Sequence, residues 1–364
     1  MTDPSDIAVE VADLSKNYGP VQALKSVSFS IESGRYYALL GPSGGGKTTL
    51  LRLIGGFLRP SAGRVYLHGQ DVSHLPPDRR PTSMVFQNYA LFPHMNVERN
   101  VSYGLKLLKA PAGEIRDKVE RMLAMVGLEG YNRRMPHELS GGQQQRVQLA
   151  RSLVLERDVL LLDEPLASLD AKLRKDMCLE LKRIQEKVGI TFIHVTHNQE
   201  EALTVADRIA IIADGELVEE GSARDIYETP EKRFTAEFIG DNNVLPGVVA
   251  NLSDGRVTVD LGFASVDVAS HGVAAATGDD VAVSVRSELL RIVDGEPDAA
   301  WQIMPATYVE AIYLGLTVSH LVRLPDGTEI VARVISGEAN DGAFEAGKEI
   351  AVGWPGDRAR LHVA

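Results

Sequence analysis

An eight-residue run near the N-terminus constrains the fold of this chain more than any other feature. Residues 41–48 read GPSGGGKT, which has the form G-x4-G-K-[ST]. A mostly apolar run of strand type, residues 35–40, precedes it, and a helix-type run, residues 47–54, follows it. A strand, a glycine-rich turn and a helix in this order predict a loop whose backbone N–H groups point inward at phosphate oxygens.

Each part of this loop has an expected role. The glycines allow the backbone to curl, and the following helix adds its positive N-terminal end. Lys47 should reach the β- and γ-phosphates, and the Thr48 hydroxyl should ligate Mg2+. The residues expected to contact a nucleotide here are Gly41, Pro42, Ser43, Gly44, Gly45, Gly46, Lys47, Thr48 and Thr49. The alternative, a glycine-rich turn without a ligand, is disfavoured by the flanking strand and helix.

Two carboxylates follow a second apolar run. Residues 159–162 read VLLL, which is typical of a fully buried parallel strand, and Asp163 and Glu164 come directly after them. The carboxyl ends of parallel strands are where α/β sheets place their ligands. We expect Asp163 to hold Mg2+ through its water shell and Glu164 to orient or deprotonate an attacking water. An Asp-Glu pair that caps a solvated loop is the alternative, and the nearby loop disfavours it.

Five further short segments occur in a fixed order along the chain. They are KNYG with Tyr18, VFQNY with Gln87, SGGQ at residues 140–143, SLD at residues 168–170 and HVTH ending at His197. Together with the loop and the carboxylates, they make the chain resemble the ATP-binding cassette (ABC) ATPases over roughly residues 7–240.

This resemblance implies roles for the new residues. Tyr18 would stack on adenine, Gln87 would link Mg2+ and water to transport subunits, and His197 would contact the γ-phosphate. Residues of the SGGQ signature and Asp170 would face a second copy of the chain, so that two ATP molecules lie between two chains arranged head to tail. The implied catalytic residues are Lys47, Gln87, Glu164 and His197; the metal ligands are Thr48, Gln87 and Asp163; the remaining ATP contacts are Tyr18, Ser140, Gly141, Gly142, Gln143 and Asp170.

Simpler interpretations of single motifs remain open. Ser140 and Gln143 fit a capping box at a helix N-terminus, which is compatible with an anion site there. Tyr18 could be an ordinary loop aromatic, Gln87 a polar strand end and His197 a structural histidine. The joint occurrence of all the motifs in order favours the functional interpretation.

Length and pattern predict two domains. The fold class is α/β: a P-loop NTPase domain of the ABC nucleotide-binding type over residues 1–240, with a helical subdomain over about 88–157. Apolar spacing predicts helices over 112–126 and 170–188. An all-β OB/TOBE-like domain should follow over 241–364, because short alternating strands replace helices there. Strands are expected over 244–249, 256–261, 280–285, 306–314, 317–324 and 329–334.

The second domain resembles the C-terminal regulatory region of importer ATPases, through residues 283–288, 313–315 and 322–327. Arg286-Ser287-Glu288 departs from the Arg-Pro-Glu usual there. A small-ligand sensor and a plain dimer contact are both compatible with this region, and the dimer contact is favoured.

Composition excludes several classes. Residues 241–364 contain 8 Lys and Arg against 18 Asp and Glu, which disfavours nonspecific nucleic-acid binding. No stretch reaches the roughly 18 apolar residues of a membrane helix, and the acidic, polar N-terminus does not resemble a signal peptide. A single cysteine, Cys178, excludes an internal disulfide.

The resemblance therefore implies the ATPase subunit of a bacterial ABC importer, at the cytoplasmic face of the inner membrane. Implied cofactors are ATP and Mg2+. Implied partners are a second copy of the chain, two integral membrane permease subunits that contact the segment 88–97, and indirectly a periplasmic or extracellular solute-binding protein. A polyamine is the first candidate solute, and iron, sulfate, phosphonate or sugar are alternatives. A non-transport ABC ATPase is disfavoured, since the chain has neither a long coiled coil nor a second cassette.

Overall fold

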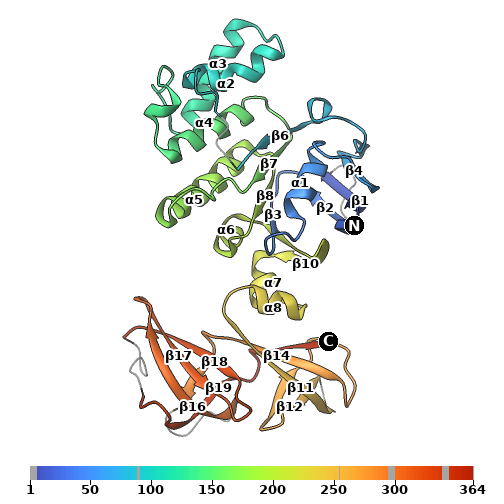
Figure 1. Cartoon of the computed structure of the whole chain (residues 1–364), viewed down its shortest axis with the longest axis vertical. Helices are drawn as coiled ribbons and strands as arrows, with labels where there is room; N and C mark the ends of the chain where they lie inside the picture. The colour runs from blue at the N-terminus through green and yellow to red at the C-terminus, as the bar shows by residue number, and fades with distance from the viewer. Residues whose placement is uncertain (1–5, 88–90, 254, 294–299, 338–343, 364) are drawn as a thin grey trace. The chain divides into compact units, whose positions relative to one another are not determined.

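The computed structural model describes residues 6–87, 91–253, 255–293, 300–337 and 344–363. The chain divides into two compact units, Met1–Arg224 and Asp225–Ala364. Figure 1 shows sheets and helices in the first unit and mainly strands in the second. None of the helices in the described ranges is long and apolar enough to cross a membrane.

A six-stranded sheet forms the centre of the N-terminal unit, in the order β10-β9-β3-β8-β7-β6. Its neighbouring strands are parallel, except that β10 runs antiparallel to β9. Every residue of β3, β7 and β8 is buried, as expected for parallel strands covered on both faces. The strands are β3 (Tyr36–Leu40), β6 (Thr82–Val85), β7 (Val159–Asp163), β8 (Thr191–Thr196), β9 (Arg208–Ala213) and β10 (Glu216–Ser222).

Alternate residues of β7 belong to two different hydrophobic cores. Leu160 and Leu162 pack with Leu181 of helix α5, whereas Leu161 packs with Leu50 of helix α1. Because successive side chains of a strand point to opposite faces, helices must cover both faces of this sheet. The helices concerned are α1 (Lys47–Ile54), α5 (Ala171–Val188) and α6 (Gln199–Val205). The first two correspond to helices predicted from the sequence.

A smaller antiparallel sheet, in the order β2-β1-β4-β5, completes the N-terminal unit. Its long first hairpin pairs Leu14 with Val27, and both side chains are buried in the same core as α1. The strands are β1 (Ile7–Tyr18), β2 (Val21–Glu32), β4 (Ala62–Leu67) and β5 (Gln70–Asp71). This sheet therefore supports the helix that follows the 41–48 loop.

Three helices lie within the range predicted to be a helical subdomain. Their buried residues, such as Val101, Leu123 and Val147, belong to one core. The predicted helix over 112–126 is present as α3. The helices are α2 (Val97–Leu107), α3 (Ala112–Met125) and α4 (Gly141–Leu153), with 3-10 turns η2 (Pro77–Arg79) and η3 (Pro136–Glu138).

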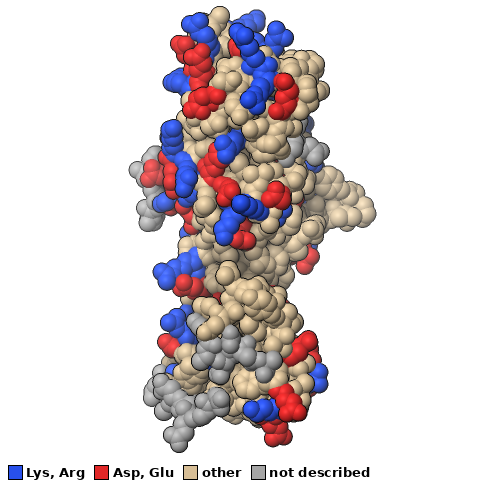
Figure 2. Space-filling view, turned by 90° about the vertical axis from the view of Figure 1, so that its left-hand side faces the viewer, with Lys and Arg blue, Asp and Glu red and all other residues tan. Residues whose placement is uncertain are grey.

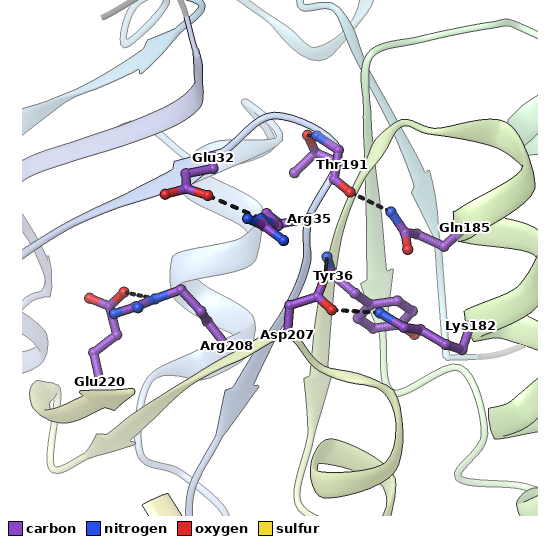
Figure 3. Close-up of polar contacts among 10 residues, drawn as sticks. Glu32, Arg35, Tyr36, Lys182, Gln185, Thr191, Asp207, Arg208 and Glu220 are labelled. Atoms are coloured by element: carbon purple, nitrogen blue, oxygen red, sulfur yellow. Dashed lines mark hydrogen bonds and ion pairs between the residues drawn. The ribbon is translucent and has the colours of Figure 1, made fainter. Parts of the chain in front are cut away.

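Polar contacts fix the amino ends of the parallel strands (Figure 3). Asp207, just before β9, accepts hydrogen bonds from the Tyr36 backbone N–H at 2.8 Å and from Lys182 Nζ of α5 at 2.7 Å. Gln185 Nε2 of the same helix donates to the Gly34 carbonyl at 2.7 Å. These bonds hold α5 against β3 at the end opposite the 41–48 loop.

A buried arginine anchors the far end of α1. Arg80 is 1% exposed, and its guanidinium donates to the carbonyls of Leu53 and Ile54, each at 2.7 Å. The last carbonyls of a helix have no partner within the helix, so Arg80 satisfies two of them. Burial lowers the pKa of Arg80 to about 10.

The C-terminal unit contains two five-stranded antiparallel sheets, in the orders β13-β12-β11-β14-β20 and β15-β19-β16-β17-β18. The strands are β11 (Asn242–Ser253), β12 (Arg256–Asp260), β13 (Ser265–Ala269), β14 (Asp280–Arg286), β15 (Arg291–Val293), β16 (Trp301–Tyr313), β17 (Thr317–Arg323), β18 (Glu329–Ile335), β19 (Glu349–Pro355) and β20 (Arg360–Val363). All six predicted strands overlap observed ones. The sequence analysis missed β13, β15, β19 and β20.

One core joins the two sheets of this unit. Val259 of β12, Tyr308 of β16 and the fully buried Trp354 of β19 are members of it. The C-terminal unit thus has its own hydrophobic interior, as an independent domain requires.

The division between the units falls inside α7 (Ala223–Glu228), earlier than the domain boundary predicted at residue 240. The following α8 (Arg233–Phe238) packs against β11, and Asn242 Nδ2 donates to the Ala236 carbonyl at 3.1 Å. Arg286 of β14 also donates to the carbonyls of Tyr227 and Ile239. The helical composition of this segment suggested the first domain, whereas its contacts tie it to the second.

Candidate functional site

The 41–48 loop begins at Gly41, directly after β3. A Cβ atom on Gly41 would lie 1.9 Å from the Ile212 carbonyl oxygen, so only glycine fits there. Gly46 precedes α1 in a left-handed conformation with φ of 105°, and no side chain caps this helix. The N-terminal N–H groups of α1 are therefore not occupied by a capping side chain, which is the arrangement that anion sites at helix ends use.

Lys47 lies folded over this loop. Its side chain is 5% exposed, and Nζ donates to the carbonyls of Gly41 and Pro42, each at 2.8 Å. Burial lowers the pKa of Lys47, and the nearby Glu164 carboxylate partly opposes this effect. Ser43 and Gly44 are exposed at the tip of the loop, whereas Gly45 is buried. A buried ammonium beside a helix N-terminus that no side chain caps fits a phosphate group.

Thr48 and Asp163, both expected to hold Mg2+, are hydrogen-bonded to each other. The Thr48 hydroxyl donates to Asp163 Oδ1 at 3.1 Å, and Asp163 is 5% exposed at the end of β7. Burial raises the pKa of Asp163, and the hydrogen bond from Thr48 and the charge of Arg52 act in the opposite direction. A hydroxyl and a carboxylate form a hard oxygen donor set of the kind Mg2+ prefers.

Arg52 was missed by the sequence analysis. Its guanidinium lies 3.6 Å from Asp163 Oδ2. Arg52 follows Thr48 by four residues in α1, and residues at this spacing lie on one helix face. This spacing could have indicated from the sequence that Arg52 lies on the same helix face as Thr48.

Two residues that follow separate strands converge on the Glu164 carboxylate, and a further hydrogen bond holds the Glu164 backbone. Gln87 Nε2, after β6, donates to Glu164 Oε2 at 3.2 Å, and His197 Nδ1, after β8, lies 3.4 Å from the same oxygen. The Glu164 backbone N–H donates to the Val195 carbonyl at 3.0 Å. Parallel strands bring their carboxyl ends to one edge of the sheet, which is why these side chains meet.

Glu164 has an unusual backbone. Its φ of 46° lies in the left-handed region, which non-glycine residues seldom adopt. Such conformations persist where the surrounding structure imposes them, and they cluster at functional sites. The carboxylate is therefore aimed by the backbone as well as by its two side-chain neighbours.

The other predicted residues lie apart from this cluster. Tyr18 ends β1 with 47% exposure, and Lys16 Nζ lies 5.2 Å from the centre of its ring. Asp170 is exposed and accepts from the Leu173 N–H at 3.0 Å, so it caps α5. No hydrogen bond or ion pair among the described residues joins Tyr18 or Asp170 to the 41–48 loop.

The SGGQ segment forms the N-terminus of α4. The Ser140 N–H donates to Gln143 Oε1 at 3.0 Å and the Gln143 N–H donates to Ser140 Oγ at 3.4 Å, which is a capping box. Ser140 is exposed, and Gly142 is buried beside Leu173 of α5. In the part of the chain that the structure describes, no polar contact links this helix end to the 41–48 loop.

The segment expected to contact membrane subunits is only partly described, since residues 88–90 lie outside the described ranges. Leu91 packs against a hydrophobic core and Val97 is buried within it. Phe92 stacks near Tyr103, whose ring is 36% exposed. Part of this segment therefore packs into the hydrophobic core. The exposed apolar surface next to it includes Tyr103.

Comparisons with known proteins agree with this geometry. Residues 24–167 match the ABC transporter family model, and residues 283–361 match the TOBE domain model. A spermidine/putrescine import ATP-binding protein of Rubrobacter xylanophilus is 45% identical over 96% of this chain and 92% of its own length. A protein of the same name from Roseobacter denitrificans is 45% identical over 97% of both chains.

A solved structure shares the fold of the first unit. It is a dimeric ATP-binding cassette in a post-hydrolysis state with ADP and phosphate, 33% identical, with a TM-score of 0.53. The match covers 59% of this chain and 99% of that one. Since relatives at 45% identity extend over nearly its whole length, the chain belongs to the ABC transporter family of ATPases, with a TOBE domain in its C-terminal part.

Proposed function

We propose that this chain is the ATP-hydrolysing subunit of an ABC importer for polyamines of the spermidine and putrescine type. The observation that carries this proposal is the similarity, at 42–47% identity, to import ATP-binding proteins of that name over most of the chain. Iron, sulfate, phosphonate and sugar importers remain the alternatives, because in this proposal the other subunits of the transporter select the solute.

The loop and the carboxylates supply the parts that phosphoryl transfer needs. Backbone N–H groups of residues 43–49 cradle the phosphates, and Lys47 exchanges its two carbonyl partners for phosphate oxygens. Tyr18 is the adenine platform, which its exposed ring permits. Stacking on an exposed aromatic requires no base-specific contact.

The donor set fits Mg2+. Thr48, Asp163 and Gln87 would hold it, with the oxygen ligands that this ion prefers. When bound, it neutralises negative charge on the phosphates. Asp163 keeps its carboxylate oriented through the bonds from Thr48 and Arg52, and both partners favour its ionised form.

Glu164 is the residue that orients the attacking water or accepts its proton. Gln87 and His197 both approach its Oε2, so they fix the direction of the carboxylate. In this proposal Glu164, Gln87 and His197 act together: Gln87 donates a hydrogen bond to the carboxylate, His197 lies within ion-pair distance of it, and Lys47 is nearby to stabilise charge on the phosphate.

A second copy of the chain completes the site. The helix end at Ser140–Gln143 is exposed and capped, and no described contact links it to the 41–48 loop of its own chain. A helix N-terminus attracts anions, so this end is available to a phosphate bound by a second chain. The cassette solved as a dimer supports a pair of chains. Two integral membrane subunits and, indirectly, an external solute-binding protein would complete the transporter, with this chain at the cytoplasmic face of the membrane.

The Glu164→Gln variant tests the catalytic assignment. A general base contributes about 10²–10⁴-fold, so ATP turnover should fall by at least 100-fold while ATP binding persists. The variant should form a dimer in ATP, measured by light scattering. Glu129→Gln, at an exposed position, is the matched control and should keep both properties of the wild type. A monomeric Glu164→Gln protein in saturating ATP would contradict the dimer.

Uptake of labelled solutes tests the substrate. Cells that carry either the wild type or Glu164→Gln would be offered putrescine, spermidine, ferric iron, sulfate, sugars and phosphonates. Loss of polyamine uptake alone in the variant is the expected result. Loss of another solute instead would overturn the polyamine assignment while leaving the ATPase assignment intact.

A further inference from the structure

A cavity of about 240 Å³ lies within the C-terminal unit, between α7, the start of β11 and the paired strands β14 and β20. Its charged lining consists of Glu228, Arg286, Glu288, Arg358 and Arg360. Basic groups outnumber acidic ones here, although the domain as a whole is strongly acidic. A local basic excess in an acidic domain indicates an anionic ligand.

Two of the charged residues are occupied by the protein itself. Arg286 donates to the carbonyls of Tyr227 and Ile239, and its guanidinium lies 4.3 Å from the centre of the Tyr227 ring. Glu288 accepts from the Tyr227 hydroxyl at 2.8 Å. Because of these contacts, Arg286 and Glu288 form a rigid part of the cavity lining and are not available to bind a ligand.

Arg358 and Arg360 differ from these two residues in their hydrogen bonding. No ion pair or side-chain hydrogen bond involves either guanidinium in the described ranges, and the buried Nε of Arg360 has no acceptor. Burial lowers the pKa of Arg360 and the charge of Arg358 lowers it further, whereas the carboxylates of Asp357 and Glu228 act in the opposite direction. A buried donor without a partner, next to a like charge, costs free energy that an oxygen anion would recover.

A second orphan group lines the same cavity. Asn242 donates through Nδ2 to the Ala236 carbonyl, but its buried Oδ1 receives no hydrogen bond from any residue that the structure describes. The cavity therefore lacks an acceptor for Arg360 and a donor for Asn242. Hydrogen phosphate carries both, because it has charged oxygens and a P–OH group, whereas sulfate has only acceptors at neutral pH.

We propose that this cavity is a binding site for a phosphate group, free or on a small ester, held by Arg358, Arg360 and Asn242. Its volume exceeds the roughly 150 Å³ cavity that holds a benzene molecule, so a phosphate with a few further atoms fits. The site is separate from the ATP site, and the proposal rests on neither hydrolysis nor transport.

The test is calorimetric titration of the full-length chain with inorganic phosphate. A saturating non-hydrolysable ATP analogue with Mg2+ keeps phosphate out of the 41–48 loop. We expect one saturable site per chain, at least tenfold weaker affinity in Arg358→Gln and Arg360→Lys, and weaker binding of sulfate. The Lys variant keeps the charge but loses the Nε donor. Arg323→Gln, which removes a surface partner of Glu329, is the control and should bind like the wild type.

Several results would overturn the site. Absence of saturable binding for both inorganic phosphate and glycerol 3-phosphate would do so, as would unchanged affinity in the two cavity variants. Equal binding of sulfate would overturn the assignment to phosphate. If Arg360→Lys loses its fold by circular dichroism, the exposed position of Arg358 makes Arg358→Gln decisive. Tighter binding of the ester than of inorganic phosphate would support an ester as the ligand.

Discussion

The two units of this chain use strands in opposite ways. In the N-terminal unit, β3, β7 and β8 are buried throughout, and the chemically important residues follow their last positions. In the C-terminal unit, strands such as β12 and β18 alternate between buried and exposed residues. A buried parallel sheet offers only its edge to ligands, whereas an antiparallel sheet offers a face. Function is therefore concentrated in a few sequence positions in the first unit and is harder to locate in the second.

The distribution of surface charge differs less between the two units than the use of strands does. Over the side drawn in Figure 2, basic and acidic side chains lie interspersed among the described residues. Ion pairs such as Lys118–Glu156 at 2.7 Å and Arg146–Glu180 illustrate this mixing in the first unit. These pairs are partly exposed, and ion pairs at the surface contribute little stability, so the cores and the strand ends carry the difference between the units.

The largest effect is expected at Gly41. Gly41→Ala would place a Cβ atom 1.9 Å from the Ile212 carbonyl oxygen, so we expect a loss of more than about 4 kcal/mol in unfolding free energy, with loss of nucleotide binding. Gly44→Ala is the matched control: its Cβ meets nothing within 4 Å, and its φ of 80° predicts about 1–2 kcal/mol. Urea unfolding followed by circular dichroism measures both. Equal losses would mean that the loop rearranges freely.

A core truncation in the other unit should be nearly as damaging to stability and harmless to catalysis. Trp354→Ala should cost about 3–5 kcal/mol, because the side chain is fully buried. Both tryptophans, Trp301 and Trp354, lie in this unit, so tryptophan fluorescence reports its unfolding alone. ATP turnover below the transition should stay within twofold of the wild type.

Trp354→Phe is the milder companion of that variant. It keeps a buried ring and removes an indole N–H that has no partner among the described residues, so its loss of stability should be clearly smaller. A more than tenfold fall in ATP turnover in folded Trp354→Ala would break the separation of the two units.

A pH effect of intermediate size is expected from His194 in β8. This residue is fully buried beside the Tyr36 hydroxyl, and burial lowers its pKa to about 3. The unfolded chain takes up this proton near pH 6.5 and the native state does not, so stability falls as the pH drops below that value. The loss should be about 2 kcal/mol at pH 5.

Comparing unfolding at pH 7 and pH 5 in the wild type and His194→Gln isolates this effect. Burial raises the pKa of Glu201, which acts in the opposite sense but is present in both proteins. The wild type should lose more stability than the variant, and the exposed-site variant His74→Gln should behave like the wild type. Parallel losses in all three proteins would rule His194 out as the source.

The smallest effect separates capping from catalysis. Ser140→Ala and Asn96→Ala each remove a helix N-cap, of α4 and α2 respectively, and each should cost about 1 kcal/mol. Only Ser140→Ala should also lower ATP turnover, by about tenfold, through the loss of a bond to a charged phosphate. Similar turnover in both variants would reduce Ser140 to a structural role.

The sequence predicted much of the first unit because its residues act locally. A loop of fixed spacing, an apolar strand followed by Asp163, and an amphipathic helix after Asp170 need no distant information. The pairing of Thr48 with Asp163 followed from two motifs that a parallel sheet must bring together.

What the sequence did not predict depends on contacts between distant segments. Arg80 caps α1 from a position 26 residues beyond Ile54, and nothing in its neighbourhood marks it as buried. β15 has only three residues, too few for a clear alternation, and β19 contains a glycine and a proline. β13 alternates as clearly as β12 does, and the sequence analysis overlooked it. The cavity at Arg358 and Arg360 is likewise formed only when β14 and β20 pair.

The left-handed backbone of Glu164 has a consequence for natural variation. Glycine or asparagine would occupy that conformation with less strain, so a variant that loses the carboxylate there would gain some stability. Random drift toward a more durable protein would then lead away from ATP hydrolysis at this position. Selection for ATP turnover must continually act against this drift. A paralogue of this chain that has lost its function should therefore be inactive and more stable than the active protein.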